Sequence, residues 1–373
     1  MKINSAEIIV RNLFDLAGIT TNGDNPYDIH IHDDQFYKRI LCDGALGLGE
    51  SYMDGWWDCQ AIDQFIDKVL KADLESKIKT TWKMALHVLK ARLFNLQKVS
   101  RAFEVGEKHY DLGNDLYEAM LDKQLNYTCG YWKNANNLDE AQEAKLDLVC
   151  KKINLESGMK ILDLGCGWGS FAKYAAENYG AEITGVTVSK RQVELGRELC
   201  KGLPVDLRLE DYRNVSGQYD RVISIGIMEH VGYKNYHTYM NIVDRCMKDS
   251  GIALIHTIGR NESSTHGNVW TEKYIFPNNM LPSIAQLGKV MEGLFVMEDW
   301  HNFGPDYDKT LMAWFENFNG AWPRLKDKYG ERFYRMWRYY LLSCAGGFRA
   351  RDSQLWQIVM TRVGTIQPNC RIC

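Results

Sequence analysis

The chain has 373 residues, of which 45% are apolar and 25% are charged, and its formal net charge is −3. These values fit a globular protein with a full core and two domains, and the small net charge excludes a global attraction to nucleic acid. No apolar run approaches the ~20 residues that span a bilayer, and ten scattered cysteines without a signal-peptide core predict a reduced, cytoplasmic protein.

Aromatic side chains are numerous, with 11 Trp, 20 Tyr and 13 Phe. They exceed what a core alone requires and indicate a large apolar or cationic ligand. The single C-x-x-C pair, Cys370 and Cys373, has no second pair or histidine near it in the sequence, so no metal site is predicted.

Residues 1–80 are predicted to form a small α+β domain of their own. Residues 6–17 have helical spacing of apolar side chains, residues 27–32 alternate as a strand does, and residues 33–40 return to helical spacing. Residues 41–59, LCDGALGLGESYMDGWWDC, combine four glycines with clustered aromatics. This segment fits a packing core, with a binding role as the alternative.

Residues 77–103 hold seven basic residues and no acid, with apolar residues between the charges. This composition predicts a basic amphipathic linker, assigned to residues 81–104, that rests on an anionic membrane surface. A solvated helix between domains fits the same composition.

The segment MKILDLGCGWGS, residues 159–170, is the strongest local pattern in the chain. Strand-forming residues run into Asp163, glycines recur at three alternate positions, and residues 171–178 favour a helix. Glycine permits close approach of backbone to a ligand, and the free N–H groups of the helix favour a negative charge. Dinucleotide-binding proteins use a similar turn, and a plain strand-to-helix turn is a further alternative. With Asp163 leading it, the turn resembles the nucleoside loop of S-adenosylmethionine (SAM) methyltransferases.

Strands and helices alternate from this loop onward, which is the pattern of a parallel, doubly wound α/β sheet with its ligand crevice at the carboxyl ends of the strands. Residues 138–153 are predicted to form an amphipathic helix before the first strand, and residues 260–350 a mostly helical lid over the crevice. The last strand, 352–363, is expected to be antiparallel and to close the sheet. The preceding strands are predicted at residues 159–164, 181–187, 205–210, 220–226 and 251–258.

Eight separated segments together resemble the cyclopropane-fatty-acyl-phospholipid synthase family. The resemblance spans nearly the whole chain, including the small N-terminal domain, which the shorter mycolic-acid cyclopropane synthases lack. In chain order the segments are GLGESYMDGWW, GEKHYDLGND, YTCGYW, LDLGCGWGS, IGIMEHVG, IHTIG, WHNFGPDYDKTLMAW and GGFRARDSQLWQ.

This resemblance implies a seven-stranded class I SAM-dependent methyltransferase (Rossmann-like) domain at residues 105–373, with a helical substrate cover. It implies that SAM methylates a cis double bond in an acyl chain of a membrane phospholipid, and that a cyclopropane ring then closes. It further implies a homodimer at the inner face of the membrane, in which residues 1–80 contact lipid or dimerise.

Carried over by resemblance, the cofactor site uses residues of five segments. Many methyltransferases place an acid at the end of the second strand, but EITGVTVS has none, and Gln192 is the better candidate there. The implied SAM contacts are Tyr127 and Thr128 closing over the cofactor, Asp163, Gly165, Gly167 and Gly169 at its amino-acid end, Thr187, Ser189 and Gln192 beside the ribose and the glycine loop, Asp211 and Tyr212 at the adenine, and Gly226 beside the methyl group.

Methyl transfer to an alkene leaves a carbocation, so water must be excluded and a base must remove a proton. The resemblance implies that a bound bicarbonate ion is this base, and that Tyr307 and Trp314 stabilise the cation. Each residue taken alone also fits an ordinary structural role, and Cys344, a thiol suspected of a role in the family, is interpreted as structural. The implied ion ligands are the backbone N–H groups of Cys129 and Ile258 and the side chains of Glu229, His256 and Tyr307.

Three alternatives are open to the same sequence. A SAM-dependent N- or O-methyltransferase keeps the glycine loop but has no use for the ion ligands. A non-catalytic lipid- or nucleotide-binding protein needs only the basic linker and the aromatic lid. A nicotinamide oxidoreductase is expected to carry an acid about twenty residues after the loop, which is absent.

Overall fold

The computed structural model describes residues 5–74 and 113–372. They divide into two compact units. The first unit holds described residues of Met1–Phe94 with His266–Pro277 and Tyr307–Ser353, and the second holds those of Asn95–Thr265 with Asn278–Asp306 and Gln354–Cys373. The expected boundaries at residues 80 and 105, and the basic linker between them, lie outside the described residues. The expected lid, 260–350, contributes to both units.

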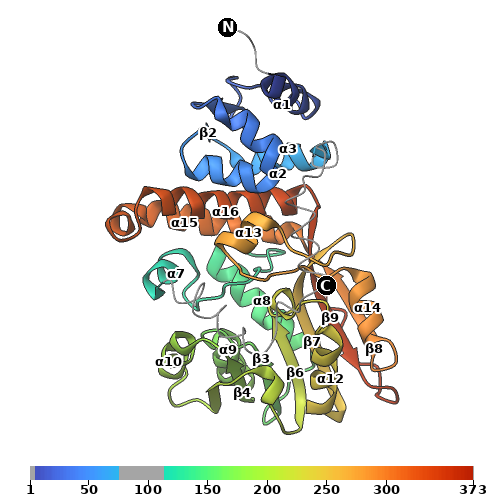
Figure 1. Cartoon of the computed structure of the whole chain (residues 1–373). Coiled ribbons are helices and arrows are strands. Elements are labelled where there is room, and N and C mark those ends of the chain that lie inside the picture. Colours follow the sequence, from blue (N-terminus) through green and yellow to red (C-terminus); the bar gives the residue numbers. More distant parts are fainter. Residues whose placement is uncertain (1–4, 75–112, 373) are drawn as a thin grey trace. The chain divides into compact units, whose positions relative to one another are not determined.

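The second unit is built on a seven-stranded sheet (Figure 1) with the strand order β5-β4-β3-β6-β7-β9-β8. The pairs β3/β4, β4/β5, β3/β6 and β6/β7 are parallel, and β8/β9 is antiparallel. The chain winds outward from β3 in both directions, so the ligand crevice is expected beyond the carboxyl ends of β3, β4 and β6. The strands are β3 Lys160–Leu164, β4 Glu182–Thr187, β5 Val205–Leu209, β6 Tyr219–Ile225, β7 Met247–Arg260, β8 Val296–Asn302 and β9 Ser353–Thr361.

Both faces of this sheet are buried, because successive side chains of a strand point to opposite faces and helices cover each face. Ile161 of β3 and Ile223 of β6 pack into one apolar cluster with α8 and α9. Their neighbours Leu162 and Val222 pack into a second cluster with α11, α12 and α14. The helices of this unit are α7 Asn114–Met120, α8 Leu138–Lys152, α9 Ser170–Tyr179, α10 Lys190–Leu199, α11 Met228–Val231, α12 Tyr236–Cys246 and α14 Ile284–Met291.

One strand differs from the sequence prediction. The predicted last strand exists as β9 and pairs antiparallel with β8, but β9 lies inside the sheet, between β7 and β8. The edge strand is therefore β8, which falls within the range predicted to be mostly helical. Val296 and Met297 of β8 are exposed, so the strand carries no apolar alternation that its sequence could reveal.

The first unit combines the N-terminal elements with α13, α15 and α16. Its short strands β1 and β2 are antiparallel, and Trp57 of β2 is fully buried. A side chain at Gly49 would overlap the ring of Trp270, so this glycine serves close packing, which supports the packing-core interpretation of residues 41–59. The elements are α1 Ser5–Leu16, β1 Ile29–Ile31, α2 Gln35–Met53, β2 Trp57–Cys59, α3 Ile62–Lys71, α13 Val269–Tyr274, α15 Pro305–Tyr329 and α16 Glu331–Arg349.

None of the helices within residues 5–74 and 113–372 combines the length and the apolar character that crossing a bilayer requires.

Candidate active site

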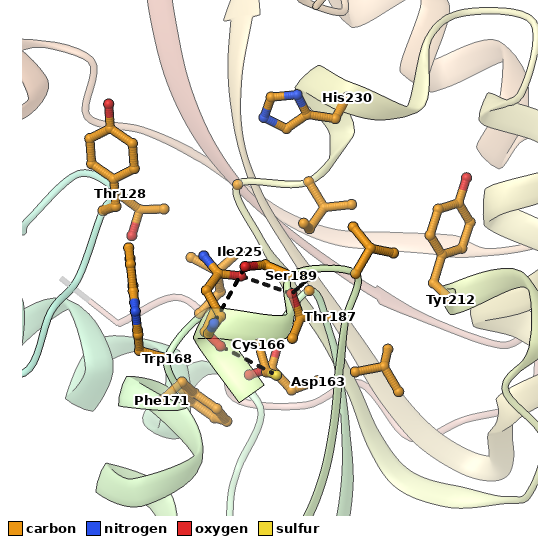
Figure 2. A pocket seen from close by; sticks show the side chains of 18 of the residues that line it. Thr128, Asp163, Cys166, Trp168, Phe171, Thr187, Ser189, Tyr212, Ile225 and His230 are labelled. Atoms are coloured by element: carbon orange, nitrogen blue, oxygen red, sulfur yellow. Dashed lines mark hydrogen bonds between the residues drawn. The ribbon is translucent and has the colours of Figure 1, made fainter. Parts of the chain in front are cut away.

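A cavity of about 180 Å³ lies beyond the carboxyl ends of β3, β4, β5 and β6 in the second unit. Figure 2 shows Thr128, Trp168 and Phe171 on one side of this cavity and Tyr212 on the other. Eleven of the twelve residues expected to bind SAM line it, and Gly169 does not. The eleven are Tyr127, Thr128, Asp163, Gly165, Gly167, Thr187, Ser189, Gln192, Asp211, Tyr212 and Gly226.

The three loop glycines have positive φ but different surroundings. Gly167 (φ +55°) faces open space, so its backbone is free to approach a ligand. At Gly169 (φ +83°), a Cβ would lie 3.0 Å from Leu207 Cδ1 and 3.2 Å from Cys200 Sγ. Gly169 therefore packs the start of α9 against its neighbours, which explains why it does not line the cavity.

The loop after β4 is held by a small hydrogen-bond network. The Thr187 hydroxyl donates to Gln192 Oε1 at 2.8 Å, and the Ser189 N–H donates to Thr187 Oγ1 at 3.2 Å. Ser189 also caps α10 through its contact with the Gln192 N–H. Because the Thr187 hydroxyl already binds the side-chain oxygen of Gln192, the side-chain nitrogen of Gln192 remains to donate a hydrogen bond to a ligand.

Two buried carboxylate oxygens of the cavity wall make no hydrogen bond within the described residues, namely Asp163 Oδ1 and Asp211 Oδ2. Burial raises the pKa of Asp163 to about 7, against the opposing charge of Lys145. Asp211 Oδ1 accepts the Arg213 N–H at 3.0 Å, and Oδ2 lies 3.4 Å from Arg213 Nη1. A nucleoside with an amino-acid tail offers ammonium, amino and hydroxyl groups to such acceptors, so the cavity fits SAM.

Glu229 lies in α11, directly after β6, and reaches across to the end of β7. Its Oε1 accepts the Ile258 N–H at 2.6 Å, and its Oε2 has no hydrogen-bond partner among the described residues. Burial raises the pKa of Glu229 to about 7, opposed by hydrogen bonds from the Ile258 and Glu229 N–H groups and the Thr257 hydroxyl. Ile258 was expected to give its N–H to an ion, but in this structure that N–H binds Glu229.

His256 lies two residues before Ile258 on β7 and is buried. Burial and the charges of Lys145 and Lys152 lower its pKa far below the usual range, so the ring is neutral. The Gln357 amide nitrogen lies 3.3 Å from His256 Nδ1. As that nitrogen is a donor, the ring proton belongs on Nε2, which has no hydrogen-bond partner within the described residues.

Cys129 follows the two cavity residues Tyr127 and Thr128 and is completely buried. Its thiol donates to the Gly130 carbonyl at 3.1 Å. Tyr131 packs on Phe303, the same ring that lies beside His256. The second unit thus brings Cys129, Glu229, His256 and Ile258 to one end of its sheet.

The other three aromatic or thiol candidates belong to the first unit. Tyr307, near the start of α15, is buried against Phe348 and Trp314, with ring centroids at 4.6 and 5.9 Å. Burial raises the pKa of the Cys344 thiol, in α16, to about 12. That thiol is therefore no nucleophile near neutral pH, in agreement with its structural interpretation.

Among the cavity-lining residues that sequence reasoning missed are Lys145, Trp168 and His230. Trp168 stands inside the glycine motif and could have been included from its position there. Lys145 gave no signal, because a lysine in an amphipathic helix is usually solvated. Among residues 5–74 and 113–372 no group of three or more His, Cys, Asp or Glu side chains is placed to hold a metal ion.

Comparison with known proteins agrees with this geometry. Residues 97–358 match the family model of mycolic acid cyclopropane synthetase. The chain is 53% identical over 354 residues to the cyclopropane-fatty-acyl-phospholipid synthase of Escherichia coli (strain K12), a match that covers 95% of this chain and 93% of that protein.

Two solved structures place the fold. Mycolic acid cyclopropane synthase CmaA1, complexed with SAH and CTAB, has a TM-score of 0.66 at 29% identity over 70% of this chain and 98% of its own. Coclaurine N-methyltransferase has a TM-score of 0.71 at 20% identity, over 84% and 99% of the two chains, and shows the fold alone. The second unit has the class I SAM-dependent methyltransferase sheet, as predicted. The chain belongs to the mycolic acid cyclopropane synthetase family.

Proposed function

We propose that the protein transfers the methyl carbon of SAM to the cis double bond of an unsaturated acyl chain in a membrane phospholipid and closes a cyclopropane ring. The protein is a SAM-dependent enzyme of its family, and its 53% identical relative carries the name of this activity. One observation carries the proposal beyond that likeness. Glu229, just after β6, and His256, on β7 opposite the last residue of β6, are buried, and each has a polar atom without a partner in the described residues.

The donor cavity supplies positioning. SAM, when bound, supplies a methyl group electrophilic enough to react with an alkene. Asp163 and the loop glycines would hold its amino-acid end, Thr187, Ser189 and Gln192 would hold the ribose region, and Asp211 and Tyr212 would hold the adenine. Fixing the donor in line with the double bond can remove roughly 7–11 kcal/mol of barrier.

Ring closure requires that a proton leave the transferred carbon, and for this step we propose a bound bicarbonate ion. The bicarbonate ion would be a base that accepts this proton without itself being methylated by the donor. The His256 Nε2–H is a donor without a partner, and a protonated Glu229 Oε2 would be a second donor to an anion. Cys129 would complete the set within the second unit, with Ile258 acting through its hydrogen bond to Glu229.

An N- or O-methyltransferase is a weaker account of this site. Its acceptor already carries a lone pair and needs at most one proton acceptor. A neutral buried histidine on β7 and a buried glutamate with raised pKa just after β6 exceed that need. The likeness to coclaurine N-methyltransferase concerns the fold and does not favour that chemistry.

The setting of the reaction is part of the proposal. We infer peripheral association with the inner face of the membrane, because the substrate is an acyl chain within a bilayer. Residues 77–103, with seven basic side chains and no acid, would attract the anionic surface. A homodimer would present two such segments and strengthen the attachment.

The test compares two vesicle preparations that differ only in the acyl chain. With SAM and cis-unsaturated phospholipid vesicles, S-adenosylhomocysteine should form and the double bond should disappear. Vesicles of the saturated phospholipid with the same headgroup should give no product. Equal turnover on both would show a headgroup acceptor and would refute the proposal.

The ion site has its own test in Glu229→Gln. We expect turnover to fall by roughly 100-fold or more, the usual contribution of acid–base groups, with little change in the dissociation constant of SAM. Glu182→Gln, an exposed change on β4, is the matched control. A loss of SAM affinity large enough to explain the loss of turnover would contradict the assignment.

A further inference from the structure

Lys145 is a buried lysine in the wall of the donor cavity, and its charge has no evident structural purpose. It lies in α8 with 1% of its surface exposed, and it lines the cavity beside Asp163. A buried ammonium is costly unless hydrogen-bonded or paired. Among the described residues it has no ion pair at salt-bridge distance, and its hydrogen bonds go to two neutral oxygen atoms.

These partners fix the direction of the lysine donors. Lys145 Nζ lies 3.0 Å from Asn126 Oδ1 and 3.0 Å from Thr128 Oγ1. The orientation of the Asn126 amide is set in turn by Asp122, whose Oδ2 accepts the Asn126 Nδ2–H at 2.8 Å and whose Oδ1 accepts the Asn126 N–H at 2.8 Å. The amide nitrogen therefore faces Asp122, and its oxygen faces the lysine.

The contact with Thr128 has a consequence for the cavity. An ammonium group can only donate, so the Thr128 oxygen must be the acceptor. The Thr128 hydroxyl proton then points away from Lys145, and Thr128 lines the cavity and is partly exposed there. Gln142 holds the same residue from the other side, since its Nε2 donates to the Thr128 carbonyl at 2.7 Å. The Thr128 hydroxyl, which lines the cavity, thus keeps its proton to donate to a group bound there.

At this part of its wall the cavity carries a buried cation, Lys145, and a buried carboxyl that interacts with it, Asp163. Two of the three ammonium protons are used by Asn126 and Thr128, and Asp163 Oδ1 has no hydrogen-bond partner in the described part of the chain. A zwitterion with a carboxylate and an ammonium group complements this pair of charges. The α-amino-acid end of SAM is such a zwitterion.

We propose that Lys145 is a positioning residue for the α-carboxylate of the donor: it turns the Thr128 hydroxyl toward that carboxylate and supplies the opposite charge. This inference rests on the proposed use of SAM and extends it to a residue of α8. Burial lowers the pKa of Lys145 to about 8, opposed by Asp122, Cys129 and Asp163, so the ammonium remains mostly protonated at pH 7.

The test measures ligand binding by the full-length protein, without turnover. The ligands are S-adenosylhomocysteine, its decarboxylated analogue and 5′-methylthioadenosine, which lacks the amino-acid end. The wild type should prefer S-adenosylhomocysteine to the decarboxylated analogue by roughly 10- to 100-fold, the usual effect of hydrogen bonds to a charged group. Lys145→Gln should abolish this preference and leave the affinity for 5′-methylthioadenosine unchanged.

Two variants complete the design. Thr128→Val keeps the size of the side chain and should reduce the same preference, and the double variant should lose less than the sum of the two single losses. Lys151→Gln, in the same helix but exposed and paired with Asp147, should bind all three ligands as the wild type does. If Lys145→Gln cannot be purified folded, Thr128→Val and the wild-type preference still decide.

Equal losses for all three ligands in Lys145→Gln would show a purely structural lysine and overturn the inference, as would a wild type without preference for the carboxylate. The binding test contains no acceptor lipid, so its result does not depend on the reaction. Failure of this inference can therefore be distinguished from failure of the proposed function. Discrimination by Lys145 without cyclopropane formation would retain the inference and reject the reaction.

Discussion

The raised pKa of Glu229 makes a quantitative prediction for Glu229→Gln. Burial moves the pKa from the usual 4.5 to about 7, and each unit corresponds to about 1.4 kcal/mol. The folded state therefore favours the protonated carboxyl by roughly 3 kcal/mol in total. Since the folded-state pKa is the higher one, this stability is fully present below about pH 4.5 and is lost as pH rises through 7.

Glutamine cannot titrate, and its side-chain oxygen can still accept the Ile258 N–H. Relative to the wild type, the variant should gain roughly 2 kcal/mol in free energy of unfolding between about pH 5 and pH 8, because the remaining ~1 kcal/mol is already lost below pH 5. Asp163, whose pKa is also raised to about 7, is present in both proteins, so its contribution cancels.

The assay is urea denaturation of both proteins at several pH values, with Glu182→Gln as the exposed control. The quantity that matters is the difference between variant and wild type at each pH. A difference in unfolding free energy that stays constant from pH 5 to pH 8 would refute the reasoning. It would mean that the pKa of Glu229 is the same in the folded and the unfolded protein.

Three further predictions concern other parts of the molecule. Gly226→Ala should weaken S-adenosylhomocysteine binding by about 10-fold or more in a titration, because Gly226 has φ +76° and a Cβ there would lie 2.8 Å from Thr128 Cγ2; unchanged affinity would contradict the tight approach. Lys152→Met should cost roughly 3–5 kcal/mol of unfolding free energy, since it leaves buried Asp299 without its 2.7 Å partner, and adding Asp299→Leu should recover most of it. Cys344→Ala should keep kcat/KM within about 2-fold, because burial raises the pKa of that thiol to about 12; a large loss would restore a chemical role.

Much of the second unit could be predicted because its signals are local. Short apolar runs between turns predict the strands β3 to β7. Helix α8 is indicated by Asn137, whose side chain accepts the Glu140 N–H, and by the lysines in its last turn. The glycine loop indicated where the cavity lies, because a backbone that passes close to a ligand requires glycine. Strand β8 could not be found in this way, since it is held by pairing with β9, more than fifty residues later.

The limits of sequence reasoning are similar at the site. Glu229 and Ile258 are 29 residues apart, and no pattern in either segment announces that the carboxyl would take the Ile258 N–H. Lys145 is a further case, because its burial results from the loop at 126–128 folding over α8. The basic character of residues 77–103 remains a prediction, as that segment lies outside the described residues.

The most direct measurement of the central claim uses SAM with a fully deuterated methyl group and vesicles of a cis-unsaturated phospholipid, followed by mass spectrometry of the acyl chains and headgroups. Ring closure removes one deuterium from the transferred carbon. The account therefore predicts acyl chains in which a cyclopropane ring has replaced the double bond and the added carbon bears the other two deuterium atoms. Retention of all three, on an acyl chain or on a headgroup nitrogen or oxygen, would show simple methyl transfer and would contradict cyclopropane formation by this protein.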